Sequence, residues 1–462
     1  MNKIKKPYSL ATLFSGAGGL DSGFVKSGKF KSRFANDVLT PPALTYSKNH
    51  DKHIQNVSDF NMKPKFPCYI VGDVTKINFG LLKKIDCVIG GPPCQDFSIT
   101  RKNRNSLGVK MARGRLYSHF IRILKKTRPR VFIFENVPGL KSVNNGNAYN
   151  IICKDLQNLN NRWSKNMIDD NATNYHLIFN NIIDSSHIGV PQRRKRLIII
   201  GVRKDRIRWL KDRHLMDKIE NTMQDKKSLL KKYPITAMEA FEGKTIPELA
   251  DKYKETMESY NDIIKYVDTN YSRMWIKNIF NNITFNVVKD YLFFNNIKFR
   301  DDSEIDQAFK THKKILKELG YYKKSLKNRK FKDGSNKIPV ESEHIRERMM
   351  HIPPDMNHLF VENTKWNVNG TMSNIYRRIC PLKPAYTVLA YGGGGTWGYH
   401  YEKERGMMTN RERARLQTFS DDYEFQGNVS QIRAQIGEAV PVRLGQKLSE
   451  IAEYILKQTQ RK

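Results

Sequence analysis

Cysteine is scarce in this sequence. Its 462 residues include five cysteines, at positions 68, 87, 94, 153 and 380, and no two of them form a C-x-x-C pair. The odd number and the spacing argue against a disulfide framework, and the Cys/His clusters that bind structural zinc are missing. We therefore expect a reduced, cytosolic protein whose site contains no metal.

Long apolar stretches and acidic residues are also few. No run approaches the roughly 20 residues that a transmembrane helix needs, and the basic start MNKIKK precedes no signal-peptide core. The 81 Lys+Arg outnumber the 46 Asp+Glu, which gives a formal net charge of +35. Such an excess favours a polyanionic partner, with nucleic acid ahead of a membrane surface. The length is sufficient for two domains.

The stretch GGPPCQDFS, residues 90–98, is the most informative part of the chain. The apolar residues 85–89 before it predict a buried strand. Two glycines and two prolines end that strand, which places Cys94 on a loop at its carboxyl end, where open α/β sheets bind ligands. A thiolate there can attack an electron-poor carbon and leave again. Spacing alone does not exclude that Cys94 is simply a small buried residue.

Three further strand ends carry polar or glycine-rich residues. Residues 8–14 predict a first strand that runs into Ser15-Gly16-Ala17-Gly18-Gly19 and the start of a helix, where glycines and free N–H groups allow close contact with a ligand. The second strand ends at Asp37, about 20 residues after the glycines, where a doubly wound nucleotide fold holds a ribose. The third ends at Asp73. Together these ends predict one continuous pocket edge.

The rest of the first half completes an α/β sheet. The polar, basic residues 100–115 after Cys94 are a candidate lid over an anionic substrate. Residues 131–134 predict another buried strand, tipped by Glu135, a candidate acid or hydrogen-bond partner of a base ring. The short link between predicted strands 175–183 and 196–202 indicates an antiparallel hairpin. We therefore predict a doubly wound, mostly parallel sheet with one antiparallel hairpin.

Seven motifs in this chain resemble those of the DNA (cytosine-5)-methyltransferase family of bacterial restriction–modification systems. They occur in the family's order and are LFSGAGG (13–19), GGPPCQDFS (90–98), RGRLY (113–117), FENVPGL (134–140), VPQRRKR (190–196), TNRERARLQTF (409–419) and QIGEAVP (435–441). The resemblance implies the α/β fold of S-adenosylmethionine-dependent methyltransferases. It also implies methyl transfer from S-adenosyl-L-methionine to carbon 5 of cytosine in double-stranded DNA, with the base flipped out of the duplex.

The same resemblance implies the residues of the site. Cys94 would add to ring carbon 6, Glu135 would hold the ring nitrogen and the exocyclic amine, and Arg194 with Arg196 would anchor the base and support the nucleophile loop. The implied catalytic residues are Pro93, Cys94, Glu135, Arg194 and Arg196. The implied cofactor contacts are Phe14, Gly16, Ala17, Gly19, Asp37, Val38, Asp73, Val74, Leu116 and Glu438. The implied DNA contacts are Ser98, Arg101, Gln192, Arg377, Arg378, Thr387, Val388, Gly393 and Gly394. Thr12 stands where the family usually has an acidic residue.

Domain organisation and partners follow from the motif order. We expect a catalytic and cofactor-binding domain over 1–204, a smaller target-recognition domain over 205–400, and a return segment over 401–462 that completes the first domain. The helical spacing of apolar residues from 440 to 455 predicts a final helix packed on that domain, and residues 207–231 predict a charged helix. We expect a monomer that binds DNA and shares its target with a restriction endonuclease without forming a stable complex.

Two alternatives remain at this point. The first is an RNA (tRNA) methyltransferase of the same fold, although such members usually carry a Cys-Phe-Thr tripeptide that is absent here. The second is a non-catalytic DNA-binding protein, which would be expected to lose Cys94, Glu135 or the glycines.

Overall fold

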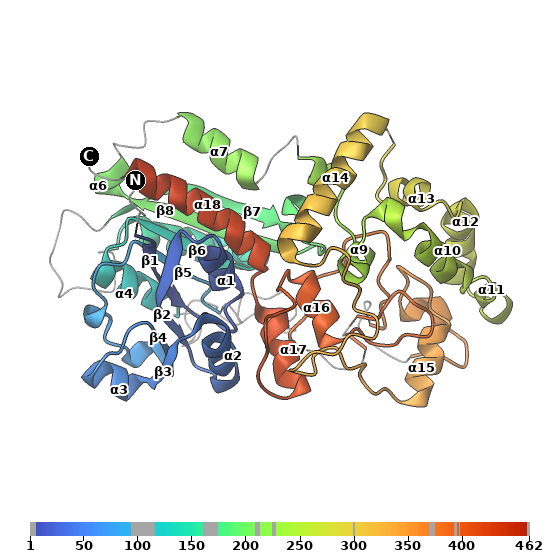
Figure 1. Cartoon of the computed structure of the whole chain (residues 1–462), viewed down its shortest axis with the longest axis horizontal. Helices are drawn as coiled ribbons and strands as arrows, with labels where there is room; N and C mark the ends of the chain where they lie inside the picture. Colours follow the sequence, from blue (N-terminus) through green and yellow to red (C-terminus); the bar gives the residue numbers. More distant parts are fainter. Residues whose placement is uncertain are drawn as a thin grey trace. The chain divides into compact units, whose positions relative to one another are not determined.

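The computed structural model describes residues 6–93, 116–159, 174–207, 213–223, 228–298, 301–368, 375–391, 395–396 and 398–459. Contacts divide the chain into two compact units (Figure 1). Unit 1 comprises Met1–Ser185, Lys195–Lys226 and Val442–Lys462, and unit 2 comprises Ser186–Arg194 and Lys227–Pro441. These bounds differ from those of the predicted domains, because residues 186–194 and 401–441 group with unit 2 and residues 205–226 with unit 1. The roles predicted for the domains stay predictions.

Unit 1 contains an eight-stranded sheet in the order β3-β4-β2-β1-β5-β6-β8-β7. The strands are β1 (Tyr8–Leu13), β2 (Phe30–Asp37), β3 (His53–Asn56), β4 (Cys68–Val71), β5 (Cys87–Gly90), β6 (Val131–Asn136), β7 (Tyr175–Asp184) and β8 (Lys195–Arg203). The strands from β3 to β6 are parallel, whereas β8 runs antiparallel to both β6 and β7. The predicted mostly parallel sheet with one antiparallel hairpin is confirmed.

The sheet order creates a switch point between β1 and β5. The chain proceeds from β1 outward through β2 and β4, then returns to β5 on the other side of β1. Ligands of open α/β sheets bind beyond the carboxyl ends of the strands at such a point. Here those ends are Leu13, followed by the glycine-rich turn, and Gly90, followed by the loop that leads to Cys94.

Apolar runs in the sequence explain most of the strands. The exception is the polar edge strand β3, which the sequence did not predict. All six residues of β6, VFIFEN, are buried, as expected for a parallel strand covered on both faces. In contrast, β3 has the sequence HIQN, and only Gln55 of its four residues is buried. It lies at the edge of the sheet and pairs with β4 alone. Because it has neither an apolar run nor an apolar alternation, nothing in its sequence indicates a strand.

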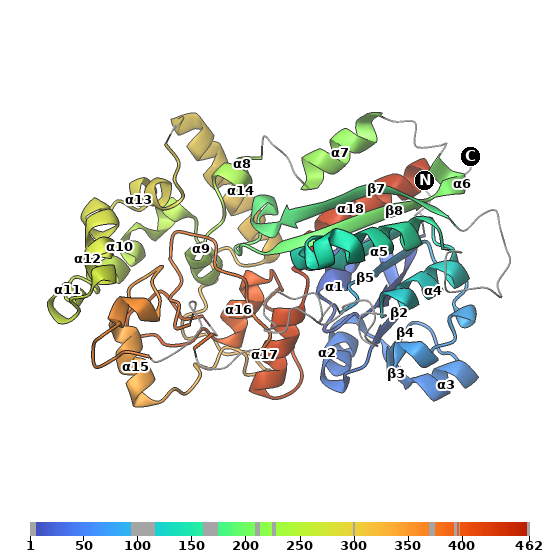
Figure 2. The same cartoon turned by 180° about the vertical axis from the view of Figure 1, so that it is seen from behind.

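Helices cover both faces of the sheet. Figure 1 shows α1 and α18 in front of it, and Figure 2, from behind, shows α4 and α5. The helices of unit 1 are α1 (Gly19–Lys26), α2 (Thr40–His50), α3 (Val57–Met62), α4 (Tyr117–Thr127), α5 (Asn147–Gln157), α6 (Lys204–Ile207), α7 (Arg213–Met223) and α18 (Val442–Gln458). The predicted final helix is confirmed: α18 buries Leu444, Leu448, Ile451 and Ile455. It packs closely on α1, because a Cβ on Gly445 would lie 2.5 Å from the Leu20 carbonyl oxygen.

The charged helix predicted over 207–231 is wrong as one continuous element. Within that range the structure has α7 (Arg213–Met223) and the start of α8 (Leu229–Lys232) as separate helices. Ser228 begins the second of them, since its hydroxyl oxygen accepts a hydrogen bond from the Leu230 amide at 3.2 Å. A serine in this position marks a new helix start.

Unit 2 is built from helices, most of them short, and from irregular segments. Its helices are α8 (Leu229–Lys232), α9 (Ala237–Glu242), α10 (Ala250–Glu258), α11 (Ile263–Tyr266), α12 (Asn270–Asn278), α13 (Val287–Phe294), α14 (Asp302–Leu319), α15 (Glu343–Met350), α16 (Asn410–Leu416) and α17 (Val429–Glu438). Within its described residues, strand pairing is limited to isolated bridges, such as that between Gln192 and Ala385. No helix in the part of the chain that the structure describes is long and apolar enough to cross a bilayer.

Short 3-10 helices complete both units. They are η1 (Val74–Lys76), η2 (Phe79–Leu81), η4 (Pro138–Lys141), η5 (Val143–Gly146), η6 (Ser185–Ile188), η7 (Ile246–Leu249), η8 (Phe280–Asn282) and η9 (His358–Val361). Of these, η1 begins at Asp73, one of the predicted site residues, which makes its cap relevant to the site.

Candidate active site

The ends of β5 and β6 are held together at the switch-point edge of unit 1. The Asn136 side-chain amide donates a hydrogen bond to the Pro92 carbonyl oxygen at 3.1 Å. Gly91 lies against the Glu135 carboxylate so closely that a Cβ at this position would be 2.5 Å from Oε2. A larger residue here would have to displace the Glu135 carboxylate. The loop that leads to Cys94 starts directly beside the Glu135 carboxyl group.

Glu135 is buried and paired with an arginine. Arg196 Nε lies 2.8 Å from Glu135 Oε1, and both side chains are almost completely shielded from solvent. Burial lowers the pKa of Arg196, and the adjacent Glu135 carboxylate opposes that shift. A guanidinium nevertheless stays charged in proteins. The pair fixes the direction of the carboxyl group at the strand end, where it could hold a polar ring edge by charge-assisted hydrogen bonds.

The loop after β5 continues outside the described part of the chain. Pro93 is described and exposed, whereas Cys94, Ser98, Arg101 and the predicted lid over 100–115 lie outside the described residues. The same is true of Gly393 and Gly394. The roles expected for these residues stay predictions.

The glycine-rich turn and the end of β2 form the second part of the edge. Gly16 and Gly18 have φ values of 51° and 82°, which suit glycine. The Gly16 amide donates to Asp37 Oδ2 at 3.0 Å, and the Val38 amide donates to Asp37 Oδ1 at 2.7 Å. Burial raises the pKa of Asp37, and these amide hydrogen bonds oppose the shift. Because a carboxylate can accept about four hydrogen bonds, Asp37 keeps capacity for ribose hydroxyls.

The surroundings of this turn fit an adenosyl group. A Cβ on Gly18 would lie 2.7 Å from the Tyr46 ring, so the turn has no room for a side chain. Val38 is 63% exposed directly beyond Asp37 and offers an apolar surface to a flat base. Asp73 is exposed, and one carboxylate oxygen caps η1 by accepting from the Thr75 amide at 2.9 Å; this bond lowers its pKa.

The other predicted cofactor contacts differ in exposure. Ala17, Gly19 and Val74 are buried, Phe14 and Leu116 are half-buried, and Glu438 at the end of α17 belongs to unit 2 and is exposed. Buried members can offer only backbone groups to a ligand. Thr12 does not face this edge, since its hydroxyl donates to the buried Asp21 carboxylate at 2.6 Å.

Gln192 and Arg194 lie in the interior of unit 2. Gln192 is fully buried, and its predicted contact with DNA stays a prediction. Arg194 is 1% exposed and donates to the carbonyl oxygens of Val388 and Gly437 at 3.0 and 2.7 Å. Among the described contacts, the arginine that touches Glu135 is Arg196.

Arg378, also predicted to contact DNA, lies in the interior as well. It is fully buried and donates to the Ile352 carbonyl oxygen at 2.7 Å and to the carbonyl oxygens of Met349, His400, Glu402, Lys403 and Arg405. Its contact with DNA stays a prediction. Val388 is likewise buried. Thr387 is exposed, and Arg377, which stacks on Tyr386, is 34% exposed, so both stay candidates for DNA contact.

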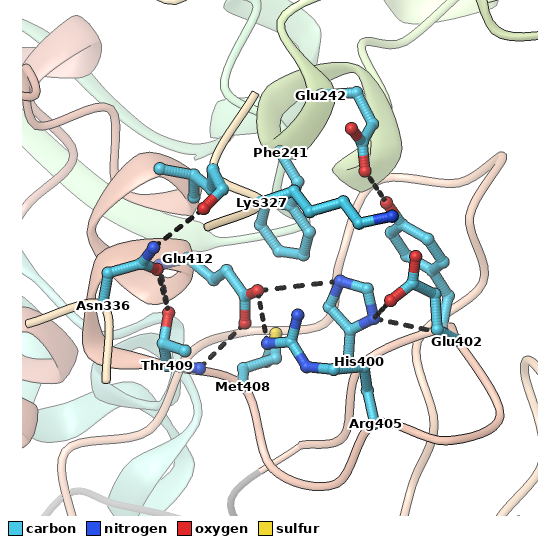
Figure 3. A network of polar contacts seen from close by, with 12 residues as sticks. Phe241, Glu242, Lys327, Asn336, His400, Glu402, Arg405, Met408, Thr409 and Glu412 are labelled. Carbon is cyan, nitrogen blue, oxygen red and sulfur yellow. Dashed lines mark hydrogen bonds and ion pairs between the residues drawn. The ribbon is translucent and has the colours of Figure 1, made fainter. Parts of the chain in front are cut away.

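Unit 2 also contains a buried charged network that sequence reasoning missed. Figure 3 shows Glu412 between Arg405, His400 and Thr409. Arg405 donates to Glu412 Oε1 at 2.8 Å, and Thr409 and Glu412 form the capping box that begins α16. Burial raises the pKa of Glu412 and lowers that of His400 well below its usual value. The T-x-x-E spacing at 409–412 was the available signal for the cap.

Comparison with known proteins identifies the family. The family model of C-5 cytosine-specific DNA methylases matches residues 8–454. The chain belongs to this family. It is 45% identical to the DNA (cytosine-5-)-methyltransferase M.ApeKI of Aeropyrum pernix, over 97% of this chain and 99% of that protein. It is 30% identical to the type II methyltransferase M.BbvI of Brevibacillus brevis, over 93% of this chain and 86% of that protein.

The likeness to a solved structure agrees with the fold of this methylase. A crystal structure described as a DNA modification methyltransferase encoded within an E. coli prophage superposes with a TM-score of 0.55 at 20% identity, over 97% of this chain and 99% of the other. The predicted family and enzyme class, a DNA (cytosine-5-)-methyltransferase, are confirmed. The family and its fold imply S-adenosyl-L-methionine as the methyl donor.

Proposed function

We propose that this methylase modifies a cytosine within a short, specific sequence of double-stranded DNA through a covalent adduct with Cys94. Carbon 5 of cytosine is too weak a nucleophile to take a methyl group unaided. A base inside a duplex is also out of reach, so it must be flipped out, at a cost of a few kcal/mol. The observation that carries the proposal is the buried Glu135 carboxylate, held 2.8 Å from Arg196 Nε beside the loop that leads to Cys94.

The proposed chemistry divides one difficult substitution into two easier steps. The Cys94 thiolate adds to ring carbon 6, and the electrons of the 5,6 double bond make carbon 5 enamine-like. Glu135 holds the ring nitrogen and the exocyclic amine, and Arg196 keeps that carboxyl group in position. S-adenosyl-L-methionine supplies the methyl group when bound. Loss of the proton from carbon 5 then expels the thiolate and restores the double bond.

We place the methyl donor at the switch-point edge of unit 1. The backbone of the glycine-rich turn would contact it, Asp37 would accept from its ribose, and Asp73 would accept from its adenine amine. The exposed Val38 would cover one face of the adenine. These assignments use the amide-bound Asp37 and the side-chain-free turn described above.

We further propose that residues 205–400 recognise the target sequence and that the protein acts in the cytoplasm as a monomer. Lys and Arg contacts to phosphates would position the duplex, and a few side chains would distinguish base edges. Arg377 and Thr387 remain exposed for such contacts. Methylation would protect the host DNA from a restriction endonuclease with the same target.

Substitution of the nucleophile tests the covalent step. We expect Cys94→Ser to lose methylation by orders of magnitude and still bind DNA, because phosphate contacts lie elsewhere. DNA that contains 5-fluorocytosine should trap the wild-type protein covalently, since fluorine cannot leave as a proton, and should not trap the variant. Normal turnover by Cys94→Ser would refute the assignment. Glu135→Gln, which keeps the shape of the side chain, should slow single-turnover methylation more than it weakens DNA binding.

A further inference from the structure

We infer that Gln192, Arg194 and Gln417 form a buried brace that positions the loop over 385–391 against the end of α17, and that these three are positioning residues for the reaction. All three side chains are buried. Their polar groups are directed at the backbone of three segments of unit 2 that are distant in sequence.

Gln192 joins the first two of these segments. The backbone of residues 191–193 pairs with Ala385, whose amide donates to the Pro191 carbonyl oxygen at 3.0 Å and whose carbonyl oxygen accepts from the Arg193 amide at 2.8 Å. The Gln192 side-chain oxygen then accepts from the Val388 amide at 2.9 Å. Its amide group donates to the Leu416 carbonyl oxygen at 3.1 Å, which adds the end of α16.

Arg194 and Gln417 add the end of α17. The Arg194 guanidinium donates to the carbonyl oxygens of both Val388 and Gly437. Gln417 donates to the carbonyl oxygens of Ile436 and Ala439 at 2.7 and 3.1 Å, and its own oxygen accepts from Gln192 at 3.3 Å. Gly437 packs so closely on Ala390 that a Cβ would overlap the backbone of residues 389–390. The loop and the helix end therefore have one relative position that satisfies these contacts.

The segment 192–196 carries a second set of contacts in an alternating pattern. Gln192 and Arg194 face the interior of unit 2, Arg193 and Lys195 are exposed, and Arg196 pairs with Glu135 in unit 1. Only Lys195 lies between Arg194, which holds the loop, and Arg196, which holds the proposed catalytic carboxylate. A shift of the loop around Val388 would be transmitted to Arg196 along an extended backbone with little slack. The brace would make catalysis depend on a correctly seated loop.

The inference rests on the proposed role of residues 385–391 in target recognition. It is tested with Arg194→Met in the full-length protein, with Arg193→Met as the matched control, because that substitution removes the same charge from the neighbouring exposed position. The measured quantities are kcat/KM for methylation of a target duplex, the same constant for duplexes with one base pair of the target changed, and the melting temperature.

We expect Arg194→Met to lower kcat/KM on the target by about 100-fold, the effect of a misplacement of roughly 1 Å. The ratio between target and altered duplexes should also fall, because a loosely held loop distinguishes bases less well. Arg194→Lys, which can reach one carbonyl oxygen at a time, should recover part of that ratio. Arg193→Met should leave the ratio unchanged.

A folded Arg194→Met protein with an unchanged ratio would overturn the inference, because a merely structural role would lower activity on all duplexes equally. If that variant does not fold, Gln192→Met carries the same expectation, since it leaves the Arg194 contacts in place. Trapping of the wild-type protein on 5-fluorocytosine DNA separates the two proposals. Its failure would refute the covalent mechanism whatever the brace variants do.

Discussion

The two units of this methylase are stabilised by different means. Unit 1 has an eight-stranded sheet with a large apolar core cluster that includes Phe120, Phe132 and Phe134 packed edge to face. Most helices of unit 2 are short, and the described part of it contains no strand. Its largest fully buried side chains include five arginines, Arg194, Arg378, Arg411, Arg413 and Arg415.

The buried arginines replace backbone pairing in unit 2. A chain without sheet pairing still has to satisfy its buried carbonyl groups. Arg378 donates hydrogen bonds to the carbonyl groups of the segments around residues 349–352 and 400–405. Arg411 and Arg415 add buried ion pairs with Asp333 and Asp421 at 2.8 and 2.6 Å. We infer from this difference that the stability of unit 2 depends on single side chains, whereas the stability of unit 1 depends on an apolar core shared by many residues.

Arg378→Met gives the sharpest test of that difference. Each buried carbonyl group left without a donor costs about 1–3 kcal/mol. The loss of several such hydrogen bonds would therefore remove a large part of the ordinary free energy of unfolding, about 5–15 kcal/mol. We expect unit 2 to unfold, as detected by limited proteolysis within residues 340–410. Arg377→Met, at the partly exposed neighbouring position, should cost less than about 1 kcal/mol. Equal stability of the two variants would show that the hydrogen bonds of the buried Arg378 side chain are not essential for the stability of unit 2.

His312→Gln tests a second buried charge in unit 2. His312 Nδ1 lies 2.8 Å from Glu239 Oε1 and Nε2 lies 2.9 Å from the Tyr233 carbonyl oxygen, so both ring nitrogens face acceptors. The Glu239 carboxylate and these hydrogen bonds raise the pKa of His312 despite its burial. Removal of one partner of such a pair costs about 3–5 kcal/mol, measured by denaturant unfolding. Lys314→Gln, at an exposed position, is the control.

The same histidine predicts a pH dependence. Because its folded pKa is raised above 6.5, its stabilising contribution is complete below that pH and is lost as the pH rises through the folded pKa. Tyr233 and Tyr291 are the other titratable side chains near this site, and burial raises the pKa of each. The stability advantage of the wild-type protein over His312→Gln should therefore be smaller at pH 9 than at pH 6. An equal difference in unfolding free energy at the two pH values would contradict a charged His312.

Asp21→Asn examines a buried carboxyl group in unit 1. Asp21 accepts from Thr12 and Tyr46, and burial raises its pKa to about 6, above the ordinary 3.8. The folded state therefore favours the protonated carboxyl group, and the wild-type protein should lose up to about 3 kcal/mol of stability as the pH rises from 4 to above 6. Asparagine does not titrate, so the difference in unfolding free energy between the two proteins should change by this amount. A constant difference would refute the assignment.

Gly201→Ala is expected to have the smallest effect and reports on the apolar core. A Cβ on Gly201 would overlap the Phe132 ring across the β6–β8 pair. Overpacking of this kind costs about 1–3 kcal/mol. The cost should shrink when Phe132 is also replaced by Leu, and a double-mutant cycle measures that coupling. Independent effects of the two substitutions would show that the cost of Gly201→Ala does not come from contact with the Phe132 ring.

Local patterns in the sequence were sufficient for most of the sheet in unit 1, with the polar edge strand β3 as the exception. The apolar run of β6, the short link between β7 and β8, and the apolar spacing of α18 each depend on neighbours along the chain. The glycines and carboxyl groups at strand ends could be recognised for the same reason. These features determine which strands form, where the final helix lies, and to which family the chain belongs.

The burial of Gln192 and Arg378 was decided by the tertiary structure alone. Arginine and glutamine are mostly exposed in proteins, and nothing next to Arg378 in the sequence distinguishes it from Arg377. Arg378 is interior because segments 22 to 29 residues away bring backbone carbonyl oxygens to its guanidinium. Apolar periodicity is a local property of the chain, whereas the satisfaction of irregular backbone by hydrogen bonds depends on segments that meet only in the folded molecule.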